Sequence, residues 1–424
     1  MTITNQLVDF AAQRVPADAA AMMRLSLFDW AACGIAGAQE SEFDRFVSIQ
    51  LASQQGGHLV LGGGRTSAST AALVNGVLSH ALDYDDTHFD HIGHPSVAVV
   101  PAVLALSEQT GVDLAALCDA AAIGVEASIA VGIWLGRAHY QIGYHQTATA
   151  GAFGATLGAC RLLNLAPRQV RHALGLCASM ASGIKAQFGT MAKPLNAGLA
   201  ARSGVEAALW AEAGVTAAQD GLAGPLGFGP THHGQGTDIG LPVADWRINR
   251  ISHKFHACCH GLHAMLEALR GASMQIDQIE AIQIRTHPRW MSVCNIADPQ
   301  TGLAAKFSYG QTAAMALTGY DTAAIGNFTD ALAQSGQLKS LRQRVTVSED
   351  TRLSETQSEV AITLTDGRIS HLRADLMAPM SLAERADKLK GKAAALLGGA
   401  DAEGLWQAVQ GQSLGRFTDQ LAKP

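Results

Sequence analysis

The chain of 424 residues is long enough to bury one large hydrophobic core or two unequal ones. Hydrophobic residues make up 48% of it but aromatic residues only 5%, so small aliphatic side chains must fill the interior, which favours closely packed helices. The formal net charge of −6 argues against a nucleic-acid-binding surface, because such surfaces are usually basic.

The N-terminal residues 1–15 lack a basic segment followed by an apolar run, so no signal peptide is predicted. The apolar window 96–107 is too short to span a bilayer, and the longer stretch 115–136 is interrupted by Asp119 and Glu126. We interpret both as buried helices and expect no membrane partner. Seven cysteines, an odd number without the spacing of a disulfide framework, indicate a reducing compartment, and we expect a cytoplasmic protein.

The first 250 residues predict one helix after another. Residues 20–37 have apolar side chains at helical spacing and end at glycine. The glycine-rich loop 61–70 lacks a Walker lysine, so we interpret it as a flexible connection to the next helix rather than a phosphate-binding loop. Farther along, Gly151, Ala155 and Gly158 lie about one turn apart and would let two helices pack closely.

After residue 275 the pattern changes to that of β-strands. Residues 279–286 and 345–348 alternate with period two. Residues 360–372 alternate as well, and the pair Asp366-Gly367 within them predicts a hairpin turn.

A final helix is predicted to begin at a capping box formed by Ser381 and Glu384, and to end at two glycines. We therefore expect a mainly α protein in two parts. Residues 1–250 and 381–424 would form a large all-helical domain, and residues 251–380 a smaller α+β domain.

The most polar stretch of the chain is residues 80–95, where four histidines and four aspartates fall within sixteen positions. It lies between an apolar helix and Pro95, which suits the first turn of the next helix. Because a buried charge costs free energy unless it is paired, these groups either lie on a solvated surface or line a cleft. The residues alone leave both possibilities open.

Metal binding is an alternative reading of two segments. His88, His91 and His94 are spaced by threes and have aspartates nearby, and residues 256–263 contain three histidines and two adjacent cysteines. Neither segment has a compact HExxH or CxxC motif. We interpret the second segment as core cysteines followed by a helical histidine, and we predict no metal at either place.

Three further positions have ordinary structural explanations when each is taken singly. His145 precedes threonines that can cap a glycine-rich helix, whose N-terminal N–H groups would suit a carboxylate. Lys193 precedes Pro194 at the entrance of an alanine-rich helix, where a lysine is usually a solvated charge. Lys254 lies at the expected domain junction, and ligand sites favour such junctions.

Taken together, these segments resemble the MmgE/PrpD family, whose members include 2-methylcitrate dehydratase, cis-aconitate decarboxylase and iminodisuccinate epimerase. The matching segments are, in order, HALDYDDTH with HPS, GYHQTATAGAFG, KPLNAGLAARSGVEAALWAEAGVT, LAGPLGFG and HKFHACCHGLH. They cover about residues 70–265. The resemblance implies a homodimeric enzyme with a large helical domain built from both chain ends, a smaller α+β lid, and no cofactor or metal.

The resemblance also implies an active site in the cleft between the two domains. Carried onto this chain, the catalytic residues would be Asp83, His94, His145 and Lys193, and the substrate-binding residues would be Thr87, Lys254, Tyr84 and Tyr309.

Two departures from the family pattern affect this assignment. The segment from Thr87 to His94 is one residue longer than in the decarboxylases, so His88 and His91 compete for the role given to His94. Gln311 stands where the family often has a tyrosine, and Tyr309 is displaced by two residues. The chain is also shorter than typical methylcitrate dehydratases.

The implied substrates are small di- or tricarboxylates, on which negative charge develops at a carbon next to a carboxylate. We expect a lyase, either a dehydratase or a decarboxylase. His94 and His145 would transfer protons, Asp83 would orient or charge one of them, and the lysines would hold carboxylates. The alternatives are an epimerase of an iminodisuccinate-like dicarboxylate and a non-catalytic polycarboxylate-binding protein. The sequence leaves open which acid is bound, which reaction occurs, and which histidine is the acid.

Overall fold

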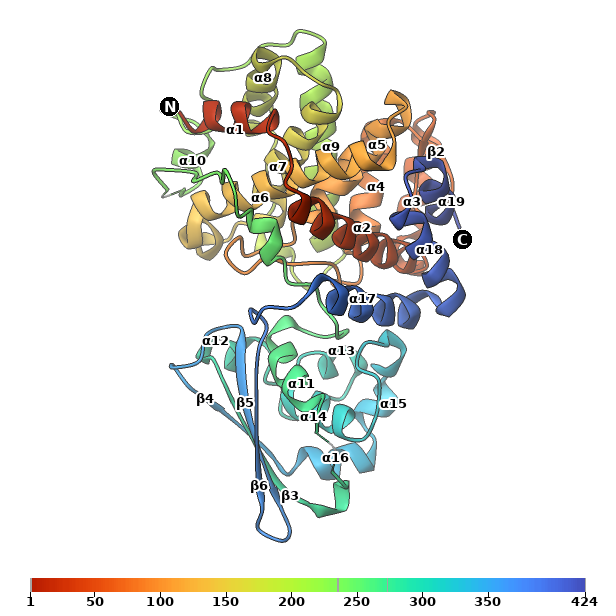
Figure 1. Ribbon diagram of the computed structural model, residues 1–424, viewed down its shortest axis with the longest axis vertical. Helices are drawn as coiled ribbons and strands as arrows, with labels where there is room; N and C mark the ends of the chain where they lie inside the picture. The colour runs from red at the N-terminus through yellow and green to blue at the C-terminus, as the bar shows by residue number, and fades with distance from the viewer. Residues whose placement is uncertain (1, 235, 273, 424) are drawn as a thin grey trace. The chain divides into compact units, whose positions relative to one another are not determined.

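The computed structural model describes residues 2–234, 236–272 and 274–423. The chain divides into two compact units, one formed by Met1–His253 with Leu397–Pro424 and the other by Lys254–Leu396 (Figure 1). The described residues are mostly helical and form only small sheets, which confirms the predicted fold class of a mainly α protein with a smaller α+β part. Helix α17 (Leu382–Leu397) is grouped with the second unit, whereas the sequence analysis assigned it to the helical domain.

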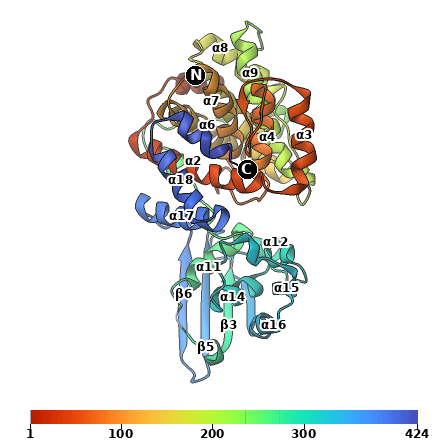
Figure 2. The same ribbon diagram turned by 90° about the vertical axis from the view of Figure 1, so that its right-hand side faces the viewer.

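The first unit is a helical body with a small β-hairpin in its described residues; α18 packs beside α2, and α19 packs against α18 (Figure 2). Its helices and strands are α1 (Ile3–Ala11), α2 (Ala17–Gly37), α3 (Asp44–Ser53), β1 (His58–Leu59), β2 (Arg65–Thr66), α4 (Ala68–His80), α5 (Ser96–Thr110), α6 (Leu114–Ile142), α7 (Gln146–Leu162), α8 (Pro167–Ala178), α9 (Ala192–Glu212), α10 (Phe228–Thr231), α18 (Gly399–Gln410) and α19 (Leu414–Leu421).

Small residues allow the central helices α4, α5, α6, α7 and α9 to pack at short distances. A Cβ atom added to Gly76 of α4 would lie 2.7 Å from the Cα atom of Gly198 on α9, closer than real Cβ atoms approach. A Cβ atom on Gly151 of α7 would lie 2.7 Å from the Cβ atom of Ala98 on α5. The prediction that small residues of the glycine-rich helix permit close packing is therefore confirmed at Gly151.

Two helices, α2 and α6, are long and apolar enough to cross a membrane by length and composition alone. Within the first unit, 78% of the most apolar window of α2 and 83% of that of α6 are buried. Such burial is typical of core helices of a folded domain and agrees with the interpretation of residues 115–136 as a buried helix. The apolar window 96–107 lies in α5, where all of its residues are buried.

The glycine-rich loop after residue 60 differs from the expectation of a flexible connection. Residues 62–64 form the turn between the antiparallel strands β1 and β2, and all three glycines have positive φ. Asn75 of α4 fixes this hairpin, because its side chain accepts from the Leu61 N–H and donates to the Leu59 carbonyl, both at 2.8 Å. A side-chain amide from the next helix thus orders a loop that the sequence pattern alone describes as mobile.

The second unit is a four-stranded sheet with helices packed on one face. Its helices and strands are α11 (His263–Leu269), β3 (Ile279–Thr286), α12 (Pro288–Val293), α13 (Gly302–Ala305), α14 (Tyr309–Leu317), α15 (Asp330–Ala333), α16 (Gly336–Arg342), β4 (Val345–Glu349), β5 (Gln357–Leu364), β6 (Ile369–Asp375) and α17. The strand order is β4-β3-β5-β6, with β3 parallel to β4 and the other pairs antiparallel.

The predicted strands and hairpin are confirmed. Gly367 has φ of +84° in the turn between β5 and β6, a conformation that suits glycine. The serine half of the predicted capping box is also present, since Ser381 Oγ accepts from the Glu384 N–H at 3.1 Å. Alternation along the strands buries Ile284 and Val360, which are paired across β3 and β5, on the face that packs against helices.

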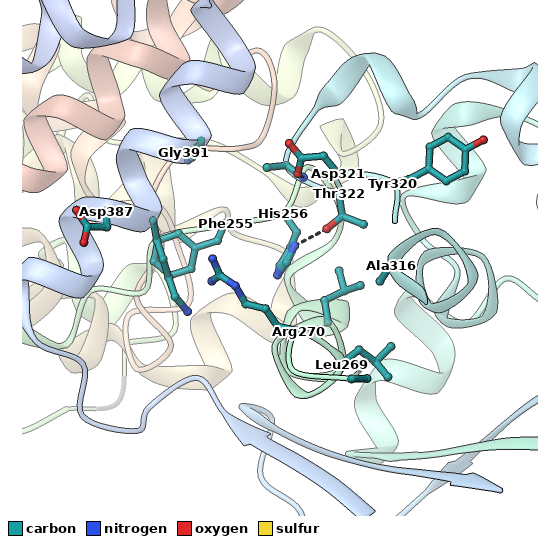
Figure 3. A pocket seen from close by; sticks show the side chains of 15 residues that line it. Phe255, His256, Leu269, Arg270, Ala316, Tyr320, Asp321, Thr322, Asp387 and Gly391 are labelled. Carbon is teal, nitrogen blue, oxygen red and sulfur yellow. Dashed lines mark hydrogen bonds between the residues drawn. The ribbon is translucent and has the colours of Figure 1, made fainter. Parts of the chain in front are cut away.

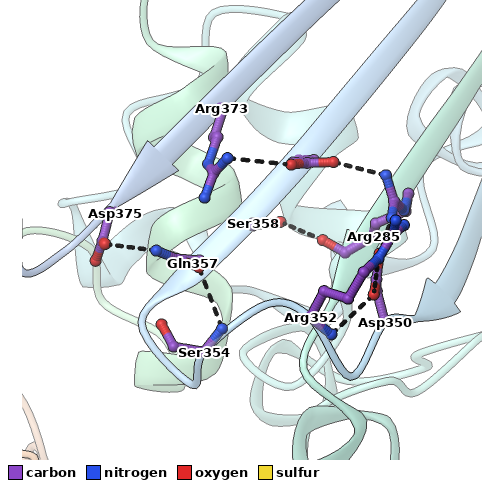
Figure 4. A network of polar contacts seen from close by, with 9 residues as sticks. Arg285, Asp350, Arg352, Ser354, Gln357, Ser358, Arg373 and Asp375 are labelled. Carbon is purple, nitrogen blue, oxygen red and sulfur yellow. Dashed lines mark hydrogen bonds and ion pairs between the residues drawn. The ribbon is translucent and has the colours of Figure 1, made fainter.

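Charged side chains cross the other face of this sheet (Figure 4). Arg285 on β3 pairs with Asp350 and, at 2.7 Å, with Glu359 on β5. Arg373 on β6 reaches Glu359 at 3.5 Å, so one carboxylate bridges two cations from neighbouring strands. Such cross-strand pairs support the sheet register on its exposed side.

Candidate active site

Titratable side chains from four segments of the first unit meet in one buried cluster. The helices α4, α7 and α9 and the loop between α4 and α5 supply them. In chain order they are His80 at the end of α4, Asp83, Asp85 and His94 on the loop, His145 at the N-cap of α7, and Lys193 in the first turn of α9.

The cluster is a row in which carboxylates alternate with an ammonium group and imidazoles. Lys193 Nζ lies 2.7 Å from Asp83 Oδ1, which lies 3.2 Å from His94 Nε2. On its other side, His94 Nδ1 lies 2.7 Å from Asp85 Oδ2, and Asp85 Oδ1 lies 2.9 Å from His80 Nδ1. Asp83 has φ of +50°, an uncommon conformation for a residue with a side chain, and its side chain remains 46% exposed. The row therefore extends from a fully buried imidazole to a carboxylate that water reaches.

His94 is the imidazole that this arrangement keeps positively charged. Burial alone would lower the pKa of His94, but the charges of Asp85 and Asp83 and their hydrogen bonds raise it above its usual value. Both ring nitrogens lie close to carboxylate oxygens, and this geometry favours the doubly protonated ring. The contact with Asp85 is a close ion pair whose angle departs from that of a well-aligned hydrogen bond.

His80 and His145 are neutral in the same cluster. Burial lowers the pKa of His80 to about 4, although Asp85 opposes this effect. Burial also lowers the pKa of His145 well below its usual value, and the charges of His80, Lys193 and His94 lower it further. Asn196 Nδ2 donates to His145 Nδ1 at 3.3 Å, which leaves Nε2 as the protonated nitrogen of the neutral ring. One charged and two neutral imidazoles thus lie side by side.

The threonines after His145 do not cap the glycine-rich helix as expected. His145 itself occupies the N-cap position, without a side-chain capping bond. Thr147 Oγ1 instead accepts from the His94 backbone N–H at 3.1 Å, and Thr149 Oγ1 lies 2.9 Å from His139 Nε2. The threonines are buried inside α7, where their hydroxyls join α7 to the loop and to α6.

His88 and His91, the competitors of His94, have other partners. His91 is fully buried, with Nε2 at 3.2 Å from Ser128 Oγ. His88 Nε2 lies 3.2 Å from the Arg247 carbonyl, and burial lowers the pKa values of both imidazoles to about 3. The structure thus places these two side chains in the core and His94 in the charged row.

The four residues assigned to substrate binding have different surroundings. Thr87 Oγ1 donates to the Ser252 carbonyl at 3.2 Å, and the side chain of Tyr84 is buried. Lys254 and Tyr309 belong to the second unit, where both are buried. The Tyr309 hydroxyl donates to the Gly261 carbonyl at 2.6 Å and lies 2.8 Å from Thr286 Oγ1.

Sequence reasoning missed several residues of the cluster. His80 and Asp85 were not among the predicted site residues, although both lie in the polar stretch 80–95. Asn196 and Phe188 were also missed; the ring centroids of Phe188 and His145 are 5.0 Å apart. The density of titratable groups in residues 80–95 was the available signal for the first two. No local pattern marked the amide or the phenyl ring.

One group in the described residues could hold a metal ion: His80, Asp83, Asp85 and His94 offer ligand atoms that all lie within 4.8 Å of one another. Two imidazoles and two carboxylates are a reasonable donor set for zinc. However, both ring nitrogens of His94 face carboxylates, and the Lys193 ammonium lies against Asp83. The arrangement fits a row of ion pairs better than a cation site.

The second unit has a pocket of its own, of about 360 Å³, lined by residues of α11 and α17 and by loop residues that include 255–256 and 320–323 (Figure 3). Two of its polar side chains, Lys388 and His256, lie near the carboxylate of Glu267. Lys388 Nζ lies 2.6 Å from Glu267, which also lies 3.3 Å from His256 Nε2, and His256 Nδ1 lies 2.6 Å from Thr322 Oγ1. Glu267 therefore offsets the charge of Lys388 beside this pocket.

Comparison with known proteins identifies the class of protein to which this fold and cluster belong. The N-terminal domain of the MmgE/PrpD family matches residues 2–238, and the C-terminal domain of the family matches residues 256–412. The chain therefore belongs to the MmgE/PrpD family.

Curated relatives are named cis-aconitate decarboxylase. The protein from Aspergillus terreus is 28% identical over 287 residues, which span 62% of this chain and 57% of that protein. The Homo sapiens protein is 30% identical over 197 residues, 45% of this chain and 40% of the relative. The Mus musculus protein is 26% identical over 365 residues, 78% of this chain and 73% of the relative. The chain thus spans less than two thirds of the Aspergillus terreus and Homo sapiens relatives.

Proposed function

We propose that this protein is a lyase that decarboxylates a small unsaturated tricarboxylate such as cis-aconitate, without a metal or cofactor. The observation that carries the proposal is the position of His94 in a row with Asp83 and Lys193, in a chain whose relatives are named for that reaction. Dehydration of a related hydroxy acid is the closest alternative within the same class.

The proposed reaction needs a place for negative charge and a source of one proton. The bond between the substrate carbon and its carboxylate breaks, carbon dioxide leaves, and the electron pair stays on the carbon. That pair then forms a C–H bond with the proton of His94 Nε2, which leaves a neutral imidazole. Lys193 would hold a remaining carboxylate, because a fixed ammonium stabilises the charge that develops beside it.

We assign different roles to His94 and His145 because their pKa values shift in opposite directions. His94 is the acid, because its raised pKa keeps a proton available near neutral pH. His145, whose lowered pKa keeps the ring neutral, would be the base in the alternative dehydration or epimerisation, because decarboxylation removes no proton from the substrate. This assignment of acid and base is part of the proposal.

The same pair of imidazoles favours an epimerase as a second candidate, since epimerisation needs one proton donor and one proton acceptor at a single carbon. A screen of cis-aconitate, citrate, methylcitrate and iminodisuccinate by proton NMR in heavy water separates the candidates. A decarboxylase converts cis-aconitate with loss of carbon dioxide and incorporation of one deuteron. A dehydratase removes water from a hydroxy acid, and an epimerase inverts and deuterates its substrate without losing either molecule.

The proposal is rejected if none of the four acids is converted. Binding without conversion, measured by calorimetry on the same samples, would instead favour a polycarboxylate-binding protein. His94→Gln is the matched control, because it keeps a polar side chain but supplies no titratable proton. We further propose a cytoplasmic homodimer, and light scattering coupled to size-exclusion chromatography measures the oligomeric state.

A further inference from the structure

Asp85 holds two imidazoles at once, one on each carboxylate oxygen. Oδ2 lies 2.7 Å from His94 Nδ1, and Oδ1 lies 2.9 Å from His80 Nδ1. The side chains of Asp85 and His80 are fully buried, whereas 12% of the His94 side chain is exposed. Asp85 is therefore behind His94, on the side of the ring opposite to Asp83.

The burial of this carboxylate requires that it be paired. A buried charge costs several kcal/mol unless opposite charges and hydrogen bonds compensate it. Burial would raise the pKa of Asp85, but the charges of His80 and His94 and their hydrogen bonds hold it well below its usual range. Asp85 is therefore an anion, and a carboxylate anion can only accept hydrogen bonds.

These contacts fix the orientation and the proton of the His94 ring. With Nδ1 paired to Asp85 at 2.7 Å, Nε2 is the nitrogen left on the Asp83 side of the ring, the side toward Lys193. The backbone N–H of His94 is held as well, by Thr147 Oγ1 at 3.1 Å. His80 keeps Asp85 in place with Nδ1, and its ring lies edge-on to that of His94, with centroids 4.7 Å apart.

We propose that Asp85, itself held by His80, is a positioning residue that directs His94 Nε2 toward the substrate and keeps His94 protonated. This inference rests on the proposed function for the identity of the reaction. Asp85 touches no reacting atom in it: when Nε2 gives its proton to the substrate carbon, Nδ1–H stays with Asp85. The proton is replaced at Nε2 from solvent on the side of the half-exposed Asp83.

The groups that face His94 are Asp83 and Asp85 from the loop, His80 from α4, His145 from α7 and Lys193 from α9. The two carboxylates favour a charged His94, and Lys193 opposes it. Removal of the Asp85 charge alone therefore leaves one carboxylate against one ammonium. The imidazole of His94 should then lose its proton at lower pH.

The test compares wild type, Asp85→Asn and the matched control Asp90→Asn, using the full-length chain. Asp90 is on the same loop, but its exposed carboxylate pairs with Arg250. Long-range proton–nitrogen NMR of ¹⁵N-histidine-labelled protein, assigned with His94→Gln, reports the protonation of each ring across pH. The kinetic arm measures kcat and KM across pH with the acid that the NMR screen identifies, and metal content is measured for all samples.

We expect wild-type His94 to carry both ring protons at pH 7 and His80 to carry only the Nδ1 proton. In Asp85→Asn, His94 should lose its proton at lower pH than in wild type. The substitution should lower kcat roughly 100-fold with little change in KM, and the basic limb of the kcat profile should shift to lower pH. Asp90→Asn should match wild type in the His94 titration, in kcat and KM, and in the pH profile. If Asp85→Asn fails to fold, the wild-type spectrum still tests the inference, because it shows whether His94 carries both ring protons.

Three results would overturn the inference: a neutral wild-type His94 at pH 6, unchanged His94 titration and pH profile in Asp85→Asn, or a stoichiometric metal that is lost in Asp85→Asn. The last would make these residues metal ligands. If no acid is turned over, the proposed function fails, yet the NMR arm still shows whether Asp85 controls the His94 proton.

Discussion

The ammonium of Lys193 lies 2.7 Å from Asp83 Oδ1, although α9 and the loop after α4 are far apart in the sequence. The same carboxylate oxygen lies 3.2 Å from His94 Nε2. Asp83 therefore lies between Lys193 and His94, the two groups that would attract the carboxylates of a substrate. A substrate carboxylate that reaches Lys193 must compete with Asp83, or share the ammonium with it.

Replacement of Lys193 should reduce catalysis without unfolding the protein. We expect Lys193→Met to lower kcat/KM by roughly 10²–10³-fold, as loss of one fixed electrostatic donor commonly does. The matched control is Arg202→Met on the same helix, which removes an exposed ion pair with Glu206. That change should alter kcat/KM by less than about twofold, because exposed pairs contribute little. Equal effects of the two substitutions would contradict the role of Lys193.

Substitutions should also separate His94 from His91. We expect His94→Gln to lower kcat per folded molecule by roughly 10²–10⁴-fold, because a proton donor is lost. His91→Ala should instead lower the free energy of unfolding by about 3 kcal/mol, since it empties a fully buried site beside Ser128. Steady-state kinetics and urea unfolding measure the two effects. A larger kinetic loss in His91→Ala than in His94→Gln would reverse the assignment.

Glu126 in the core of α6 should make stability depend on pH. Burial raises the pKa of Glu126 to about 7, from a usual value of 4.5, while its oxygen accepts from the Ile248 N–H at 2.8 Å. Between those pH values the folded protein binds a proton that the unfolded chain releases. The contribution of Glu126 to the free energy of unfolding is therefore complete below pH 4.5 and is lost as pH rises through 7.

Glu126→Gln removes this titration and keeps an acceptor. The free energy of unfolding of wild type relative to this variant should fall by up to roughly 3 kcal/mol between pH 4.5 and pH 8. Urea unfolding at a series of pH values measures the difference. Parallel stability curves for the two proteins would show that Glu126 titrates alike in the folded and unfolded states.

Two helical glycines should respond to alanine in opposite directions. Gly76→Ala places a Cβ atom 2.7 Å from the Gly198 backbone, so we expect the free energy of unfolding to fall by about 3 kcal/mol. Gly391 in α17 has no atom within 4 Å of an added Cβ, so Gly391→Ala should raise the free energy of unfolding by about 0.5–1 kcal/mol. Thermal and urea unfolding test both changes, and a stabilising Gly76→Ala would contradict the close packing of α4 and α9.

Local patterns in the sequence determined the elements of this protein. Period-two alternation predicted β3, β4 and the β5–β6 hairpin, and Asp366-Gly367 predicted the turn, because both depend on neighbouring residues. Helical spacing predicted α2, and apolar stretches predicted the buried helices α5 and α6. The polar stretch 80–95 indicated the location of a candidate site, because eight histidines and aspartates within sixteen positions are unusual in a mostly apolar chain.

Only the tertiary structure decided the partners of those charges. Three histidines spaced by threes look equivalent in the sequence, yet His88 and His91 are buried among core groups and His94 faces two carboxylates. Asp85 and His80 joined the site because the loop turns back at Asp83 toward the end of α4. The physical reason is that protonation and charge pairing depend on distances across the fold, which side-chain spacing along one segment does not specify.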